Sequence, residues 1–206
     1  MTVTLQKKLR DYVSKMSLED MFTNPLAFGM TTASELQRGI CRIADGSPVS
    51  NTETLRRALG LESTHSLPLG QPREVAILSG IRSGKSLYAS CAAVHQALTC
   101  DLSHLGPGEI PRVSIVSLTK DLAQVVFSHL VGRISASPLL RGFQVGRVGA
   151  DTVRLRHPTG REVEIKVVAG SRAGASLVAR WSAGCIFDEF PRMVGGSEGV
   201  VNWDDS

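Results

Sequence analysis

The residues from Ser79 to Ser86 have the types and the spacing that could bind the phosphates of a nucleotide: they read Ser-Gly-Ile-Arg-Ser-Gly-Lys-Ser. Gly80 and Gly84 would let the backbone turn tightly, so that its N–H groups and the start of a following helix face phosphate oxygens. Lys85 would hold the β- and γ-phosphates, and Ser86 would offer a hydroxyl to Mg²⁺. The residues predicted to contact the nucleotide in this loop are Gly80, Ile81, Arg82, Ser83, Gly84, Lys85 and Ser86. Ser79 replaces the first glycine of the general pattern, and Gly-Lys-Ser also arises by chance, so the motif depends on its setting.

A pair of acids, Asp188 and Glu189, follows the apolar run from Gly184 to Phe187. This placement predicts two carboxylates at the carboxyl end of a strand, which is the edge where open parallel sheets bind ligands. Asp188 could bind Mg²⁺ through water, and Glu189 could orient or deprotonate the water that attacks a phosphate. A solvated acid pair in a turn is the alternative interpretation.

The elements that would position these residues alternate between strand and helix. Glu74 to Ser79 is a short apolar run with β-branched residues, which predicts a strand buried on both faces. Leu87, Cys91, Val94 and Leu98 are spaced to form one apolar stripe on the next helix. Arg112 to Leu118 predicts a second buried strand, and a helix from Leu122 to Leu130 follows a cap at Thr119. This alternation predicts a parallel sheet.

Local signals assign the remaining segments. Val153 to Arg156 and Glu162 to Val167 alternate apolar and charged residues across a Pro-Thr-Gly turn, which predicts a β-hairpin. Before the sheet, helices are predicted from Leu5 to Met16, from Ala33 to Ala44 and from Thr52 to Leu59, and a connector from Gly60 to Pro72. The chain is therefore divided into an N-terminal helical segment, residues 1–70, and a core, residues 71–206.

Composition narrows the class of protein without deciding it. The 206 residues are 42% hydrophobic and 20% charged, as in ordinary globular proteins, and one main domain is expected. No apolar run approaches the roughly 18 to 20 residues that span a bilayer, so no membrane association is expected. Cys41, Cys91, Cys100 and Cys185 lack the spacing of a metal site, which favours buried free thiols.

The positive charge is concentrated in residues 131–180, which is compatible with a nucleic-acid partner. The chain as a whole carries +4, while this stretch holds nine cations against the three acids Asp151, Glu162 and Glu164, and so carries +6. The cations are Arg133, Arg141, Arg147, Arg154, Arg156, Arg161, Lys166, Arg172 and Arg180.

Together these residues resemble the ATPase domain of large terminases from tailed double-stranded DNA viruses. The features that carry the resemblance are Arg82 within the phosphate loop, the stretch from Gly170 to Gly174, and the run Phe187-Asp188-Glu189-Phe190. It extends from about Thr31 to Met193. Thr31 to Arg38 is similar to the family's adenine-recognising region, in which Gln37 would read the adenine edges; a solvent-facing Gln37 is the alternative.

The resemblance implies an α/β fold of the P-loop NTPase class (ASCE or RecA-like), with three layers and a mainly parallel central sheet that is incomplete at the C-terminus. It implies hydrolysis of ATP with Mg²⁺ to move double-stranded DNA into a procapsid, with Glu189 as the catalytic glutamate. It also implies an arginine at the γ-phosphate. Arg82 is the candidate within the subunit and Arg172 the candidate from a neighbouring subunit, with an exposed surface position as the alternative for Arg172.

The partners that the resemblance implies are double-stranded DNA, a portal protein, a small terminase subunit and further copies of the chain in a homo-oligomeric ring. The expected location is the host cytoplasm and, transiently, the procapsid portal. Only 17 residues follow Glu189, so the strand with the family's coupling motif and the C-terminal nuclease domain are expected to be missing. ATP turnover by this chain alone is therefore expected to be poor.

Two alternatives stay open. A helicase or RecA-like DNA-dependent ATPase would share Gln37, the phosphate loop and Asp188-Glu189, although Arg82 argues against it. A non-hydrolysing nucleotide-binding or assembly module is the other alternative. ATP hydrolysis by the full-length parent protein would separate that module from both enzymes.

Overall fold

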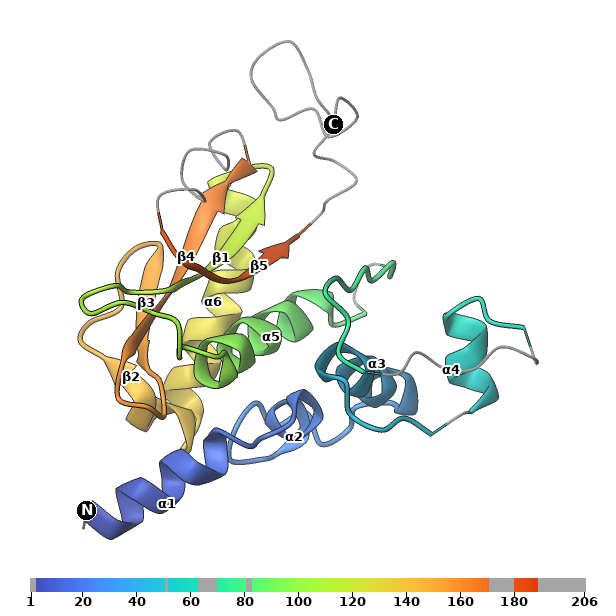
Figure 1. Ribbon diagram of the computed structural model, residues 1–206. Coiled ribbons are helices and arrows are strands. Elements are labelled where there is room, and N and C mark those ends of the chain that lie inside the picture. The colour runs from blue at the N-terminus through green and yellow to red at the C-terminus, as the bar shows by residue number, and fades with distance from the viewer. Residues whose placement is uncertain (1–2, 51, 63–69, 81–82, 171–179, 189–206) are drawn as a thin grey trace.

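The computed structural model describes residues 3–50, 52–62, 70–80, 83–170 and 180–188 (Figure 1). Within these ranges the helices are α1 (Val3–Val13), α2 (Leu18–Thr23), α3 (Glu35–Asp45), α4 (Glu53–Ala58), α5 (Lys85–Thr99) and α6 (Lys120–Ala136), with a 3-10 helix, η1 (Leu140–Phe143). The strands are β1 (Arg112–Ser117), β2 (Gln144–Val145), β3 (Thr152–Arg156), β4 (Glu162–Ala169) and β5 (Ser182–Phe187).

The strands form one mixed sheet in the order β2-β3-β4-β1-β5. In its parallel part, Ile115 of β1 lies opposite Val167 of β4 and Ile186 of β5. The other part is antiparallel, because β3 pairs with β4 and β2 pairs with β3. Since β1, β4 and β5 run in the same direction, their carboxyl ends meet at one edge of the sheet.

The antiparallel part contains the predicted hairpin of β3 and β4. Val153 and Leu155 are buried while Arg156 is exposed, as expected from side chains that alternate between the two faces of a strand. Gly160 has φ 94°, a conformation that favours glycine, and its N–H donates to the carbonyl of His157 at 2.8 Å. The hairpin is therefore confirmed together with the residue that closes its turn.

Helices α5 and α6 cover one face of the sheet. Both pack against β1 and β4 and also against each other, so they lie on the same side. Val113, Ile115 and Ile165 of the strands are fully buried in one cluster with Val94 of α5 and Leu130 of α6. This interface between sheet and helices is the main hydrophobic core.

The opposite face of the sheet has a different character. Val116 and Val168 are buried there and Phe187 packs against them. Beside them, Arg112 and Glu164 form an ion pair of 2.7 Å, with side chains only 10% and 7% exposed. Among the described elements, no helix has extensive contact with this face.

The N-terminal helices pack beside α5 and share its core. Phe22 of α2 meets the ring of Tyr88 edge-on, with centroids 6.2 Å apart. The Nε2 atom of His95 lies 2.9 Å from the carbonyl oxygen of Met16, and Arg133 donates to the carbonyl of Phe28 at 2.9 Å. These contacts join the N-terminal segment to both α5 and α6.

Several expectations need correction. Glu74 to Ser79 forms no strand and is exposed, with Ile77 38% and Leu78 92% accessible. The run has the composition of a strand, but a strand also needs a neighbouring backbone to pair with, and none of the described strands pairs with it. The α/β class holds, whereas the described part has a mixed sheet with helices on one face in place of three layers.

Smaller differences concern the helix ends. The first helix ends at Val13 and not at Met16, because the last residues close tighter turns, such as Met16 N–H to the carbonyl of Val13 at 3.2 Å. The helix predicted from Ala33 is present as α3, with Ser34 as its N-cap and Gly46, at φ 74°, as its C-cap. The helix predicted from Thr52 is α4, capped by the Thr52 hydroxyl.

Candidate functional site

The phosphate loop leads directly into α5. Gly84 is the N-cap of this helix and Lys85 is its first residue. Just before them, the hydroxyl of Ser83 donates to the hydroxyl of Ser79 at 3.0 Å and so closes the base of the loop. The helix dipole gives the start of α5 a partial positive charge, which suits a phosphate.

Gly84 is favoured at its position by its backbone conformation. Its φ of 86° lies in the left-handed region, which residues with a Cβ rarely adopt. A Cβ at this position would lie 3.4 Å from the side-chain nitrogen of Gln37, which is an ordinary contact distance. Conformation and not space therefore explains the glycine.

Gln37 contacts the loop although it lies 46 residues earlier in the chain. Its side-chain nitrogen donates to the carbonyl of Ser83 at 3.3 Å. Its side-chain oxygen accepts from the backbone N–H of Ser34 at 2.9 Å, and the Ser34 hydroxyl accepts from the backbone N–H of Gln37 at 3.2 Å. The second and third contacts form a capping box at the start of α3.

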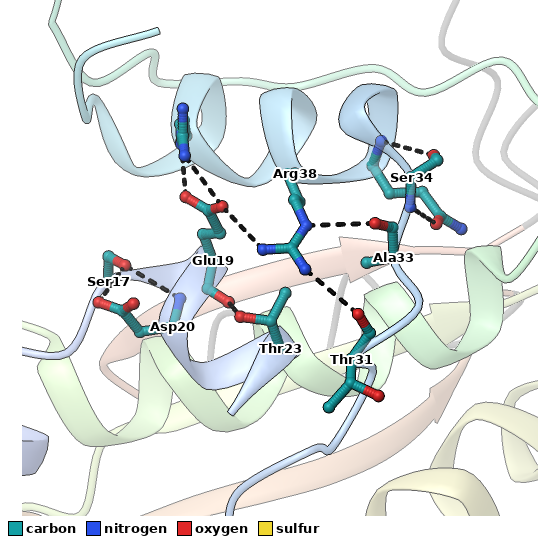
Figure 2. A network of polar contacts seen from close by, with 10 residues as sticks. Ser17, Glu19, Asp20, Thr23, Thr31, Ala33, Ser34 and Arg38 are labelled. Atoms are coloured by element: carbon teal, nitrogen blue, oxygen red, sulfur yellow. Dashed lines mark hydrogen bonds and ion pairs between the residues drawn. The ribbon is translucent and has the colours of Figure 1, made fainter. Parts of the chain in front are cut away.

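A network of polar contacts holds the segment before α3 in place (Figure 2). Arg38 donates from Nε to the carbonyl of Ala33 at 3.2 Å and from Nη2 to the carbonyl of Thr31 at 3.3 Å. Glu19 of α2 forms ion pairs with Arg38, at 3.5 Å, and with Arg42. Because Glu19 is largely buried between two arginines, it fixes the guanidinium that holds both carbonyls.

Asp188 comes directly after β5. Its backbone N–H donates to the carbonyl of Val116 at 2.8 Å, which continues the parallel pairing by one residue. Gln96, near the end of α5, donates to the carbonyl of Ala183, near the start of β5, at 2.7 Å. The helix and the strand thus run in opposite directions, and β5 ends on the side of the molecule where α5 begins (Figure 1).

Ser117 is a polar residue at this edge that the sequence interpretation missed. It ends β1, is fully buried, and its hydroxyl has no hydrogen-bond partner among the described residues. Gly170, which follows β4, lies beside it: a Cβ on Gly170 would be 3.2 Å from the Ser117 carbonyl. The available signal was a serine at the carboxyl end of an otherwise apolar strand, next to the predicted ligand edge.

Four of the predicted site residues, Ile81, Arg82, Arg172 and Glu189, lie outside the described residues. The described ones come from two segments of the chain. Gln37, Gly80, Ser83, Gly84, Lys85 and Ser86 belong to the loop and its surroundings, and Asp188 belongs to the end of β5. Lys85 and Ser86 are partly buried in the first turn of α5.

The positive stretch is only partly available to a partner. Arg154 pairs with Glu162 at 3.4 Å, Arg161 donates to the carbonyl of Gly106 at 3.1 Å, and Arg133 is held by Phe28. The exposed cations of this stretch include Arg141, Arg147 and Arg180. Part of the basic charge therefore has a structural role within the sheet and its connections.

The described residues contain no helix that is long and apolar enough to cross a membrane and no cluster of three or more His, Cys, Asp or Glu suited to a metal ion. Three of the four free cysteines, Cys41, Cys91 and Cys100, are buried as expected, whereas Cys185 is exposed. Burial raises the pKa of Cys41 to about 12 and that of Cys100 to about 11.

Comparison with protein-family models gives no match, and comparison with curated proteins gives none either. Two solved structures are similar at a distance. One is the large terminase ATPase domain of Thermus phage P74-26. The superposition covers 74% of this chain and 80% of that domain, at 16% sequence identity and a TM-score of 0.38. A mutant of that domain covers the same shares, at 15% identity and a TM-score of 0.37. These values assign no family, so the function is inferred from the residues of the chain itself.

Proposed function

We propose that the chain binds and hydrolyses ATP as the motor core of a large terminase, which moves double-stranded DNA into a procapsid. The observation that carries the proposal is the Gly84-Lys85-Ser86 start of α5 on the side of the molecule where β5 ends at Asp188. Backbone N–H groups and a lysine at one segment, with a carboxylate at the other, are the groups that a magnesium-bound triphosphate requires.

In this proposal the first turn of α5 binds the phosphates and Lys85 neutralises the terminal ones. The Ser86 hydroxyl and the Asp188 carboxylate are hard oxygen donors, which fits Mg²⁺. When bound, Mg²⁺ would neutralise charge on the phosphates. Glu189 would accept a proton from the attacking water as the bond to the γ-phosphorus forms and the bond to the leaving diphosphate oxygen breaks.

The remaining roles belong to arginines and to partners. Arg82 from the same subunit, or Arg172 from a neighbour in a homo-oligomeric ring, would stabilise negative charge that develops on the γ-phosphate. The exposed Arg141, Arg147 and Arg180 support contact with DNA phosphates. A portal protein and a small terminase subunit complete the proposed assembly, in the host cytoplasm and transiently at the portal.

Nucleotide binding is the first test, because it does not require turnover. Titration of the chain with a fluorescent ATP analogue and Mg²⁺ should give saturable binding that Lys85→Ala weakens by about a hundredfold or more. Lys8→Ala, on the exposed side of α1, is the matched control and should bind like the wild type. Equal affinity of the Lys85→Ala variant and the wild type would contradict the proposal.

Hydrolysis is tested next. Glu189→Gln should keep nucleotide affinity and abolish phosphate release, since the amide cannot take the proton from water. Stimulation by double-stranded DNA supports the packaging motor, whereas stimulation by single-stranded DNA alone would support a helicase instead. Binding without hydrolysis in the wild type would leave a nucleotide-binding module.

A further inference from the structure

Ser117 and Asp188 lie side by side on the face of the sheet that α5 and α6 cover. Ile115 of β1 and Ile186 of β5 are opposite each other in the register, and both pack in the core cluster beneath these helices. Because side chains alternate between the two faces of a strand, the residues two positions further along have the same orientation. These residues are Ser117 and Asp188, and the hydrogen bond from the Asp188 N–H to the Val116 carbonyl keeps the strands in register there.

The Ser117 hydroxyl is enclosed, and in the part of the chain that the structure describes it has no hydrogen-bond partner. On β4 the residue opposite Ser117 is Ala169, whose methyl group cannot accept a hydrogen bond. On β5 the opposite residue is Asp188, which has a carboxylate. Neighbouring strands lie about 4.8 Å apart, a separation that a serine hydroxyl and a carboxylate can span with one hydrogen bond. Of these two cross-strand neighbours, only Asp188 offers a side-chain acceptor.

A buried hydroxyl without a partner reduces the stability of a protein, so its presence calls for a reason. Alanine would fill nearly the same space at the end of this apolar strand without that cost. The hydroxyl lies at the carboxyl edge of the parallel strands, which is where such sheets bind ligands. A partner that the hydroxyl gains when a ligand binds would supply the reason.

We propose that Ser117 is a positioning residue for Asp188. Its hydroxyl donates to one oxygen of the carboxylate when a magnesium-bound nucleotide is present, and the other oxygen is left for the ion or for a water bound to it. The proposal rests on the nucleotide-binding function proposed above and adds the residue that orients the carboxylate. Metal-binding carboxylates are commonly held by such a donor, and loss of the donor weakens metal binding about ten- to a hundredfold.

Binding measurements test this role without the need for turnover. The dissociation constant of a fluorescent ATP analogue is measured with EDTA and with excess Mg²⁺, and the ratio of the two constants is the magnesium factor. In the wild type this factor should be about ten or more. In Ser117→Ala it should fall at least about fivefold, while the affinity in EDTA stays unchanged.

Matched variants separate the hydroxyl from its packing. Ser117→Thr and Ser117→Val have nearly the same shape, but only threonine keeps the donor, so Ser117→Thr should have the larger magnesium factor. Ser114→Ala changes another buried serine of β1, which lies on the opposite face, and should keep the wild-type factor. If the threonine and valine variants do not fold, the comparison of Ser117→Ala with Ser114→Ala decides.

Stability distinguishes a positioning role from a structural one. Without nucleotide, Ser117→Ala should unfold at the same urea concentration as the wild type or at a higher one, because it removes an unpaired buried hydroxyl. A large loss of stability, with equal losses of affinity in EDTA and in Mg²⁺, would show that Ser117 supports the fold and would overturn the proposal.

The dependence on Asp188 is tested in the same assay. Asp188→Asn should lower the magnesium factor at least as far as Ser117→Ala does, and the double variant should lower it no further, because both act through one carboxylate. A further fall in the double variant, an unchanged factor in Ser117→Ala, or a wild type on which Mg²⁺ has no effect would each contradict the positioning role.

Failure of this role and failure of the proposed function give different results. If the wild type binds the analogue and loses it with Lys85→Ala, while Ser117→Ala keeps the whole magnesium factor, the nucleotide site stands and the role of Ser117 fails. A wild type that binds no nucleotide would overturn both.

Discussion

The side-chain amide of Gln96 donates a 2.7 Å hydrogen bond to the carbonyl of Ala183, and its Cγ lies 2.8 Å from where a Cβ on Gly184 would stand. The Gln96 side chain therefore supplies the hydrogen-bond donor for a backbone carbonyl of β5 that a neighbouring strand would otherwise supply. It also holds the start of β5 against the second half of α5. This contact adds to the parallel pairing with β1, which sets the direction of β5 and the place of Asp188.

We expect Gly184→Ala to destabilise the protein by about 1 to 3 kcal/mol, because the new methyl group overlaps the Gln96 side chain. In a Gln96→Ala background the same change should cost less, since the overlapping atoms are gone. Urea unfolding of the two single variants and the double variant measures this coupling. Equal costs of Gly184→Ala in both backgrounds would show that the overlap is relieved in another way.

Gly84→Ala should impair nucleotide binding beyond its effect on stability. The methyl group is strained at φ 86° and approaches the Gln37 amide, which holds the loop. Gly160→Ala is a suitable control, because φ is 94° there and no atom lies within 4 Å of the new Cβ. Both variants should lose about 1 to 2 kcal/mol of stability, but only Gly84→Ala should weaken ATP binding. Similar affinities in the two variants would contradict this expectation.

The Arg112–Glu164 pair should show strong coupling in a double-mutant cycle. Glu164→Leu or Arg112→Met alone removes the nearest opposite charge of a buried group, while Arg154 still lies 4.0 Å from Glu164, and should cost up to about 3 to 5 kcal/mol. The double variant should cost much less than the sum of the two single variants. The exposed pair of Glu53 and Arg57 serves as the comparison, with an expected coupling of about 0.5 kcal/mol or less. Additive costs at Arg112 and Glu164 would argue against a buried ion pair.

Acid should destabilise the protein as pH falls below about 6.5. Burial lowers the pKa of His95 and of His157 below that of a free histidine, so both are neutral in the folded state where the unfolded chain already binds protons. In the unfolded chain each histidine has a pKa of about 6.5, so the neutral histidines stabilise the folded state fully above that pH. On acidification this stability is lost, by at most about 1.4 kcal/mol per pH unit for each histidine. Urea unfolding at pH 7.5 and 5.5 measures the loss. His95→Gln should reduce it.

The features that the sequence predicted correctly are those set by interactions between residues close together in the chain. Thr119 caps the helix that follows it, as predicted, and the charged and apolar alternation of residues 153–167 forms the hairpin. Each of these features is set by residues a few positions apart. Their agreement with the structure therefore needed no knowledge of the tertiary fold.

Contacts between distant segments were not available from the same signals. The segment from Glu74 to Ser79 has strand composition, yet strand formation depends on a partner backbone that the run itself does not specify. Gln37 was placed near the nucleotide only through the family resemblance, and its bond to Ser83 joins residues 46 positions apart. The Ser117 hydroxyl has no hydrogen-bond partner within the described ranges, and this follows from how the ends of neighbouring strands meet, which periodicity does not reveal.

The raised pKa values of the native cysteines have a practical consequence. Burial raises the pKa of Cys91 well above that of a free thiol, that of Cys41 to about 12 and that of Cys100 to about 11. At neutral pH roughly one such thiol in ten thousand or fewer is ionised, and the thiolate is the form that maleimides attack. With only the exposed Cys185 replaced by serine, a cysteine introduced at an exposed position such as Ser128 would therefore carry a fluorophore almost alone.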